Sequence, residues 1–133
     1  MTPHLIVAVD DEPTLRDVYA DLLHDEGYRV VGCAQADAVA CVHREQPDVV
    51  LLELWPPAPL GGWAIYQGLA EDPTTATIPV ILCTTIRPAA IQPPAELQTS
   101  PVAILPKPFG VDDLLGAIQT ALAFEVAALV RPS

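Results

Sequence analysis

The chain has 133 residues, and 51% of them are hydrophobic, so it fits one domain with its own core and is not expected to be disordered. Its formal net charge is -11, with one lysine and five arginines, which argues against a surface that binds nucleic acid. No apolar run is long enough to cross a bilayer and no signal peptide is evident, so we expect a cytoplasmic protein without a membrane partner.

Short apolar runs alternate with segments of helical character along the chain. The first run, His4–Val9, precedes a segment in which apolar residues recur at helical spacing, with Pro13 in its first turn and Gly27 at its end. In the second half, Pro93 and Pro94 break any long helix between the last two runs. The predicted strands cover residues 4–9, 28–34, 49–52, 78–85 and 101–106, and the predicted helices cover residues 13–27, 36–46, 62–72, 87–100 and 111–130.

The order of strand and helix, repeated five times, predicts an α/β fold. Strands joined through helices run parallel, and the helices then cover both faces of the sheet. We expect residues 1–133 to form this single domain, with no output domain behind it.

The three cysteines are Cys33, Cys41 and Cys83, and none belongs to a C-x-x-C pair. Cys33 and Cys83 lie in apolar runs, where a free cysteine behaves as a small hydrophobic residue. We therefore expect reduced core thiols in place of metal ligands or disulfides.

Polar side chains follow the apolar runs at four predicted strand ends. In doubly wound sheets, ligands bind beyond the carboxyl ends of the strands, at the point where the strand order reverses. Carboxylates that gather there repel one another and are tolerated when a cation lies among them, and such oxygen ligands suit Mg²⁺. The strand-end residues are Asp10, Asp11, Glu53, Thr84, Thr85 and Lys107.

These runs and strand ends resemble the receiver domain of two-component response regulators. The resemblance covers nearly the whole chain and rests on the stretches LIVAVDDEP, PDVVLLEL, IPVILCTT and LPKPF. It implies a flavodoxin-like, doubly wound (βα)5 sandwich of three layers with the parallel strand order 2-1-3-4-5. It also implies a signalling domain that is not an enzyme and that receives a phosphoryl group from a histidine kinase.

The resemblance assigns roles to residues by position. Asp10 and Asp11 match the acidic pair that holds Mg²⁺, with Asp11 as the direct ligand. Thr84 and Lys107 match the threonine and the lysine that contact the phosphoryl group. The expected ligands of a weakly bound Mg²⁺ are Asp10, Asp11, Glu53 and the backbone carbonyl of Trp55.

Two positions depart from the family pattern. Glu53 stands where receivers carry the acceptor aspartate. Its side chain is longer by one methylene, so its carboxylate can fill the space of the phosphoryl group, pair with Lys107 and accept a hydrogen bond from Thr84. A fixed negative charge there can imitate the phosphorylated state. Ile104 stands where receivers often carry an aromatic switch residue, three positions before the lysine.

The departures predict an atypical receiver, or pseudo-receiver, that acts through protein–protein contacts. Its expected partners are a histidine kinase or another signalling protein, and an output protein. The resemblance implies that the output protein binds the face formed by residues 87–100, 101–106 and 111–130.

Other readings stay open. Glu53 or a neighbouring acid can accept a phosphoryl group in an ordinary phosphorelay receiver, because an acyl phosphate on glutamate is chemically possible. A small Mg²⁺-dependent phosphatase is disfavoured. Phosphatases of the haloacid-dehalogenase-like kind carry Asp-x-Asp after the first strand, whereas here Asp10 and Asp11 are followed by Glu12. A flavodoxin-like cofactor binder is disfavoured, because the first loop has no glycine-rich phosphate cradle.

Overall fold

The five apolar runs of the sequence form the strands of one parallel sheet. The computed structural model describes residues 3–53, 59–84, 102–106 and 109–130. Within these residues the strand order is β2-β1-β3-β4-β5, which confirms the flavodoxin-like fold expected from the sequence. The strands are β1 (Leu5–Val9), β2 (Arg29–Cys33), β3 (Val49–Glu53), β4 (Val80–Thr84) and β5 (Val102–Pro106).

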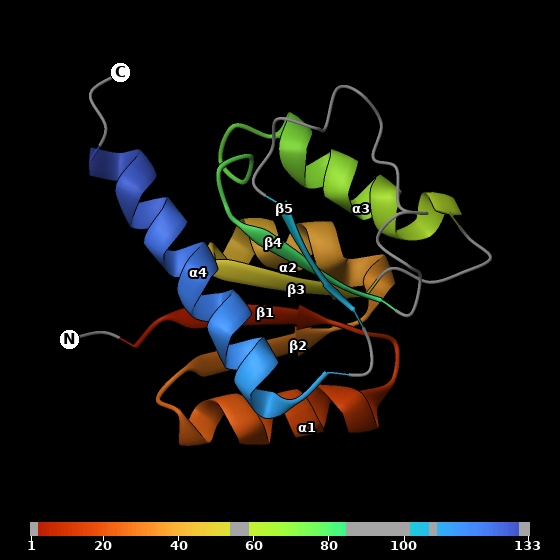
Figure 1. The fold of residues 1–133 in the computed structure, drawn as a ribbon. Coiled ribbons are helices and arrows are strands. Elements are labelled where there is room, and N and C mark those ends of the chain that lie inside the picture. The colour runs from red at the N-terminus through yellow and green to blue at the C-terminus, as the bar shows by residue number, and fades with distance from the viewer. Residues whose placement is uncertain (1–2, 54–58, 85–101, 107–108, 131–133) are drawn as a thin grey trace.

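Helices lie on both faces of this sheet and make the sandwich three layers thick (Figure 1). The first helix begins at a proline that needs no hydrogen-bond partner for its nitrogen, as predicted. It ends before Gly27, whose φ of 89° lies in the left-handed region that glycine adopts without strain. The helices are α1 (Pro13–Asp25), α2 (Ala38–Glu45), α3 (Pro59–Glu71) and α4 (Val111–Val130), with a 3₁₀ turn, η1 (Gln35–Asp37), before α2.

Two helix boundaries differ from those predicted. The segment predicted as helix 36–46 begins with the 3₁₀ turn, and it ends at Gln46, which has a left-handed φ of 48°. The helix predicted at 62–72 begins earlier, at Pro59, because a proline suits the first helical turn. The predicted helix 87–100 lies outside the described residues.

The side chains of the strands divide the core into two clusters. Ile6 and Ala8 on β1 pack with α1 and α4, whereas Val7 and Val9 pack with α2 and α3. All five residues of β3 are buried, as expected of a parallel strand covered on both faces. Among the described residues, no helix is both long and apolar enough to cross a membrane.

A single aspartate joins the amino ends of the two central strands. Asp48 precedes β3, and its Oδ2 accepts a hydrogen bond from the Leu5 N–H at 2.8 Å. The Asp48 N–H donates in turn to the Leu5 carbonyl at 2.8 Å, and the His4 imidazole lies 3.4 Å from the carboxylate.

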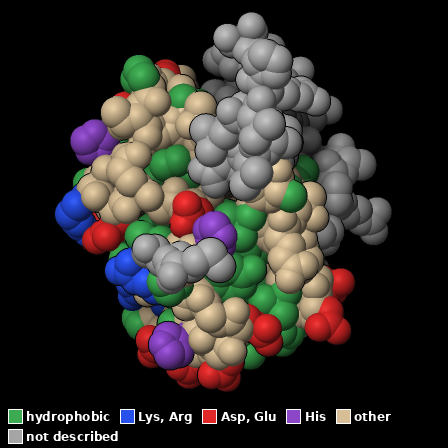
Figure 2. All heavy atoms as spheres, turned by 90° about the vertical axis from the view of Figure 1, so that its left-hand side faces the viewer, with side chains coloured by type: hydrophobic (Ala, Val, Ile, Leu, Met, Phe, Trp, Pro, Cys, Tyr) green, Lys and Arg blue, Asp and Glu red, His purple; other side chains and the backbone are tan. Residues whose placement is uncertain are grey.

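On this end of the molecule, acidic side chains are spread over the surface and basic ones lie toward one margin (Figure 2).

We predict that Asp48→Ala lowers the free energy of unfolding by about 1–2 kcal/mol, because the partly buried Leu5 N–H loses its acceptor. His4→Ala is the matched control, and it should cost about 0.5 kcal/mol or less, because the imidazole is mostly exposed. Urea unfolding of both variants measures the difference. Equal losses would assign the effect to the ion pair and not to the backbone hydrogen bond.

Candidate functional site

Two acidic side chains lie buried at the carboxyl ends of the two central strands. Val9 of β1 pairs in register with Leu52 of β3, so the next residues, Asp10 and Glu53, stand side by side. Asp10 is 1% exposed and Glu53 is 7% exposed. The chain leaves β1 toward β2 and enters β3 on the other side, so this is the reversal point at which doubly wound sheets bind ligands.

The Asp10 carboxylate is held by the backbone through one oxygen. Its Oδ1 accepts a hydrogen bond from the Glu12 N–H at 2.9 Å. Its Oδ2 is buried and has no hydrogen-bond partner among the described residues. A buried carboxylate oxygen without a partner costs free energy, so this oxygen is suited to receive a cation or a hydrogen-bond donor.

Asp11 has a different environment from its neighbour. It is exposed, and its Oδ1 accepts a hydrogen bond from the Gln35 N–H at 2.8 Å. This bond joins the loop after β1 to the turn after β2. One oxygen of the expected direct metal ligand therefore has a structural partner in the protein.

Two side chains that the sequence analysis did not select also lie beside the acids. Cys83 of β4 pairs in register with Glu53. Tyr19 of α1 is buried, and burial raises the pKa of its hydroxyl above the usual value. The charges of Cys83, Glu53 and Asp10, in that order, raise the Tyr19 pKa further, and Tyr19 and Cys83 belong to the same core cluster. The Tyr19 ring also stacks on Phe109, with ring centroids 6.4 Å apart and an interplanar angle of 14°.

Strand register could have revealed Cys83 from the sequence, because β3 and β4 are adjacent and their apolar runs are aligned. Nothing in the sequence indicated that Tyr19 lies near the site. Its helical spacing marks it only as a core residue, and its distance from the acids depends on how α1 packs on the sheet.

Some of the remaining predicted site residues lie in the described part of the chain, and others lie outside it. Thr84 is fully buried at the end of β4, and Ile104 on β5 is 36% exposed. Lys107 and Trp55 lie outside the described residues. The expected pairing of Lys107 with Glu53 therefore stays a prediction.

The acids at the strand ends offer oxygen ligands to a divalent metal ion. Within the described ranges, no group of three or more His, Cys, Asp or Glu side chains is placed to hold a metal ion. Mg²⁺ needs only one or two carboxylates and keeps several waters, and the buried Oδ2 of Asp10 is an oxygen of the kind it binds. The carboxylate oxygens at the strand ends are therefore ligands of the type that Mg²⁺ binds.

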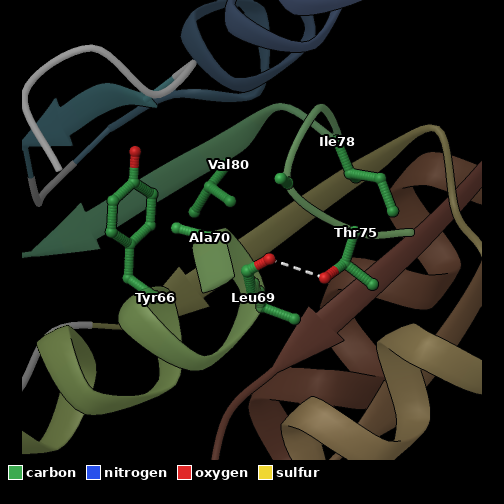
Figure 3. A pocket seen from close by; sticks show the side chains of 7 residues that line it. Tyr66, Leu69, Ala70, Thr75, Ile78 and Val80 are labelled. Carbon is green, nitrogen blue, oxygen red and sulfur yellow. Dashed lines mark hydrogen bonds between the residues drawn. The ribbon is translucent and has the colours of Figure 1, made fainter. Parts of the chain in front are cut away.

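A small cavity lies elsewhere, between α3 and the start of β4 (Figure 3). Its lining is mostly apolar, and the Thr75 hydroxyl already donates a hydrogen bond to the Leu69 carbonyl at 2.6 Å. It opens near the amino end of β4, so it is separate from the acids. The residues that line it are Tyr66, Leu69, Ala70, Thr75, Ala76, Ile78 and Val80.

Comparisons with known proteins agree with this fold. The family model of the response regulator receiver domain matches residues 6–119. Protein PilH of Pseudomonas aeruginosa is 37% identical over 81 residues, which are 60% of this chain and 66% of PilH. The matches to other curated relatives span 30% to 65% of their lengths.

Two solved structures are similar over most of the chain. Chemotaxis response regulator CheY4 of Vibrio cholerae has a TM-score of 0.78 at 24% identity, covering 91% of this chain and 100% of that one. The receiver domain of sensor histidine kinase PA1611 from Pseudomonas aeruginosa has a TM-score of 0.74 at 27% identity, covering 91% and 98%. That receiver domain holds a magnesium ion in its active site cleft.

We predict that stability falls as the pH rises above about 9, where Cys33 and then Tyr19 ionise in the unfolded chain, and that Tyr19→Phe makes the fall above about 10 shallower. The pKa of Tyr19 is higher in the folded chain than in the unfolded chain. The contribution of the neutral phenol to the free energy of unfolding is therefore complete below the unfolded-state pKa, and it is lost as the pH rises toward the folded-state pKa. Urea midpoints at about pH 8 and pH 10.5 measure the slope. Burial also raises the pKa of Cys33, so a smaller slope should remain in the variant.

Tyr28→Phe is the control, because it removes a phenol that lies away from the acids. If Tyr28→Phe and Tyr19→Phe change the slope equally, the hydroxyl of Tyr19 has no special environment.

Proposed function

Because the chain belongs to the response regulator receiver domain family, we propose that it works in two-component signalling as an atypical receiver, with Glu53 at the phosphoacceptor position. The proposal treats residues 1–133 as one receiver domain that acts by binding partner proteins. Its signal depends on the charge at the carboxyl end of β3.

The observation that carries this proposal is the position of Glu53. Its side chain is buried as the last residue of β3, beside Asp10 and in register with Cys83. An aspartate there would hold its carboxylate one methylene closer to the strand and leave room for a phosphoryl group. Glutamate carries its charge into that room, so the protein has a permanent charge where a receiver has a transient one.

Asp10, Asp11, Glu53 and the Trp55 carbonyl are the residues that would hold Mg²⁺. When bound, the ion would neutralise the buried carboxylates and supply the positive charge that phosphoryl transfer requires. The Oδ2 of Asp10 supports this assignment, because it is buried without a hydrogen-bond partner in the described part of the chain.

Other residues of the chain have proposed roles around this charge. In this proposal, Thr84 and Lys107 take toward the carboxylate of Glu53 the roles that they would have toward a phosphoryl group. Ile104 on β5 and Val111 at the start of α4 are 36% and 41% exposed. They make the face that we propose for the output partner partly apolar. The proposed partner on the input side is a histidine kinase or another signalling protein.

An ordinary phosphorelay receiver is the second candidate. The buried Asp10 and the buried Thr84 at the strand ends favour it, since both are residues that phosphoryl transfer would use. In that case Glu53 or a neighbouring acid accepts the phosphoryl group. A Mg²⁺-dependent phosphatase has less support, because the acids after β1 lack the Asp-x-Asp spacing.

We predict that the wild-type protein gains no stable phosphoryl group from acetyl phosphate and Mg²⁺, and that Glu53→Asp gains one. The shorter side chain restores the room that the phosphoryl group needs. Intact-protein mass spectrometry measures the gain, and Glu53→Gln is the control that offers no carboxylate. Phosphorylation of the wild type at the rate of Glu53→Asp would favour the second candidate.

We predict weak Mg²⁺ binding by the wild type and a dissociation constant at least about tenfold higher in Asp10→Asn and in Asp11→Asn. Each change removes a carboxylate charge from the proposed ligands. Isothermal titration calorimetry measures the binding, and Glu12→Gln is the control, since it removes a charge from the same loop but not from the ligand set. An unchanged dissociation constant in both aspartate variants would place the metal elsewhere.

A further inference from the structure

Both aspartates after β1 have one carboxylate oxygen bound to a backbone N–H. The Asp10 Oδ1 accepts a hydrogen bond from the Glu12 N–H at 2.9 Å, and the Asp11 Oδ1 accepts one from the Gln35 N–H at 2.8 Å. These bonds do not use the Oδ2 of either residue. On Asp10 that oxygen is buried and has no hydrogen-bond partner among the described residues. The pair therefore offers a cation one oxygen from each aspartate without loss of a hydrogen bond.

The two carboxylates differ in what fixes their side chains. Asp10 is 1% exposed, so the packing around it restricts its rotamers. Asp11 is exposed, so its orientation depends on the hydrogen bond from Gln35. An exposed side chain that is free to rotate has to be ordered when it binds an ion, and this ordering costs affinity. The Gln35 N–H therefore orients Asp11 before an ion arrives.

The donor of this hydrogen bond is itself held in place. The Asp10 N–H donates to the Cys33 carbonyl at 3.0 Å, which joins the end of β2 to the loop after β1. Gln35 begins the turn η1, in which the Asp37 N–H donates to the Ala34 carbonyl at 3.0 Å. The backbone on both sides of the Gln35 N–H is therefore tied down, and the sequence analysis assigned none of it to a site.

The restraint on Asp11 affects Mg²⁺ and Ca²⁺ differently. Mg²⁺ requires near-octahedral geometry, binds one or two carboxylates and keeps several waters, whereas Ca²⁺ takes roughly 6–8 oxygens and often binds a carboxylate through both of them. To present both oxygens to one ion, Asp11 would have to turn and give up the bond from Gln35. Within the described ranges, no group of three or more His, Cys, Asp or Glu side chains is placed to supply the missing ligands.

We propose that the backbone N–H of Gln35 is a positioning group that makes the acidic pair selective for Mg²⁺ over Ca²⁺, because it leaves Asp11 a single oxygen for the ion. The N–H acts through Asp11 and is not itself a ligand. This inference rests on the Mg²⁺ site of the proposed function, and it adds the group that determines which ion the site accepts.

A proline at position 35 removes this N–H with little other change to the backbone. Ala34 has φ -78° and ψ 160°, an extended conformation of the kind that residues before proline adopt. Gln35 is the first residue of the turn, a position at which proline is favoured in helices. Gln35→Ala is the matched control, because it removes the same side chain and keeps the N–H.

The test is calorimetric titration of the wild type, Gln35→Pro and Gln35→Ala with MgCl₂ and, separately, with CaCl₂. We expect the wild type and Gln35→Ala to bind Mg²⁺ at least about threefold more tightly than Ca²⁺. In Gln35→Pro the dissociation constant for Mg²⁺ should rise by about three- to tenfold, because Asp11 is no longer ordered beforehand, while that for Ca²⁺ should not rise. An equal rise for both ions, as a merely distorted loop would give, or an unchanged ratio would overturn the proposal.

Hydrogen exchange of the Gln35 amide tests the same point in the wild type, and it applies even if Gln35→Pro does not fold. Without metal, Asp11→Ala should speed this exchange, because the N–H loses its acceptor. Saturation of the wild type with MgCl₂ should leave the exchange slow, and saturation with CaCl₂ should speed it. The same exchange rate with both ions would contradict the proposed selectivity.

The titrations also separate this inference from the proposed function. If the wild type binds Mg²⁺ and Gln35→Pro binds both ions as the wild type does, only the role of Gln35 is wrong. If the wild type binds neither ion, the Mg²⁺ site of the proposed function is wrong, and this inference is overturned with it.

Discussion

The burial of two carboxylates at the ends of the central strands is the constraint on which the rest of this structure depends. Asp10 and Glu53 are 1% and 7% exposed, and removing a charge from water costs several kcal/mol unless other groups compensate. β1 and β3 are packed on both faces, so neither acid can turn away into solvent. The loop after β1 therefore has to supply hydrogen bonds, and one oxygen of Asp10 keeps the capacity to bind a donor or cation.

The two faces of the sheet have different chemistry beside these acids. On the side of α1 and α4, the Tyr19 ring stacks on Phe109, and Tyr19 belongs to the same core cluster as Cys83. On the side of α2 and α3, the thiols of Cys33 and Cys41 belong to the core cluster. The edge strand β2 connects both sides, because the Cys33 carbonyl accepts the Asp10 N–H.

The proposed change of acceptor leaves the apolar core of the fold intact, because other residues of the strands form that core. The sheet is held by the apolar residues of the strands, and the family model of the receiver domain matches residues 6–119. In the proposed function, Glu53 stands at the position of the chemistry and Ile104 at the position of the output. Membership of a family therefore establishes the fold, and the function has to be argued from the side chains at the site.

The sequence by itself determined the strand and helix order, the parallel sheet and the gathering of Asp10 and Glu53 at one edge. Each of these follows from local patterns, because apolar runs and helical periodicity are read over a few residues and parallel strands end at the same edge. The stacking of Tyr19 on Phe109 and the hydrogen bond between Asp11 and Gln35 were decided only by the tertiary structure. These depend on the packing of helices on the sheet and on the path of loops, and both are set by contacts between residues far apart in the chain.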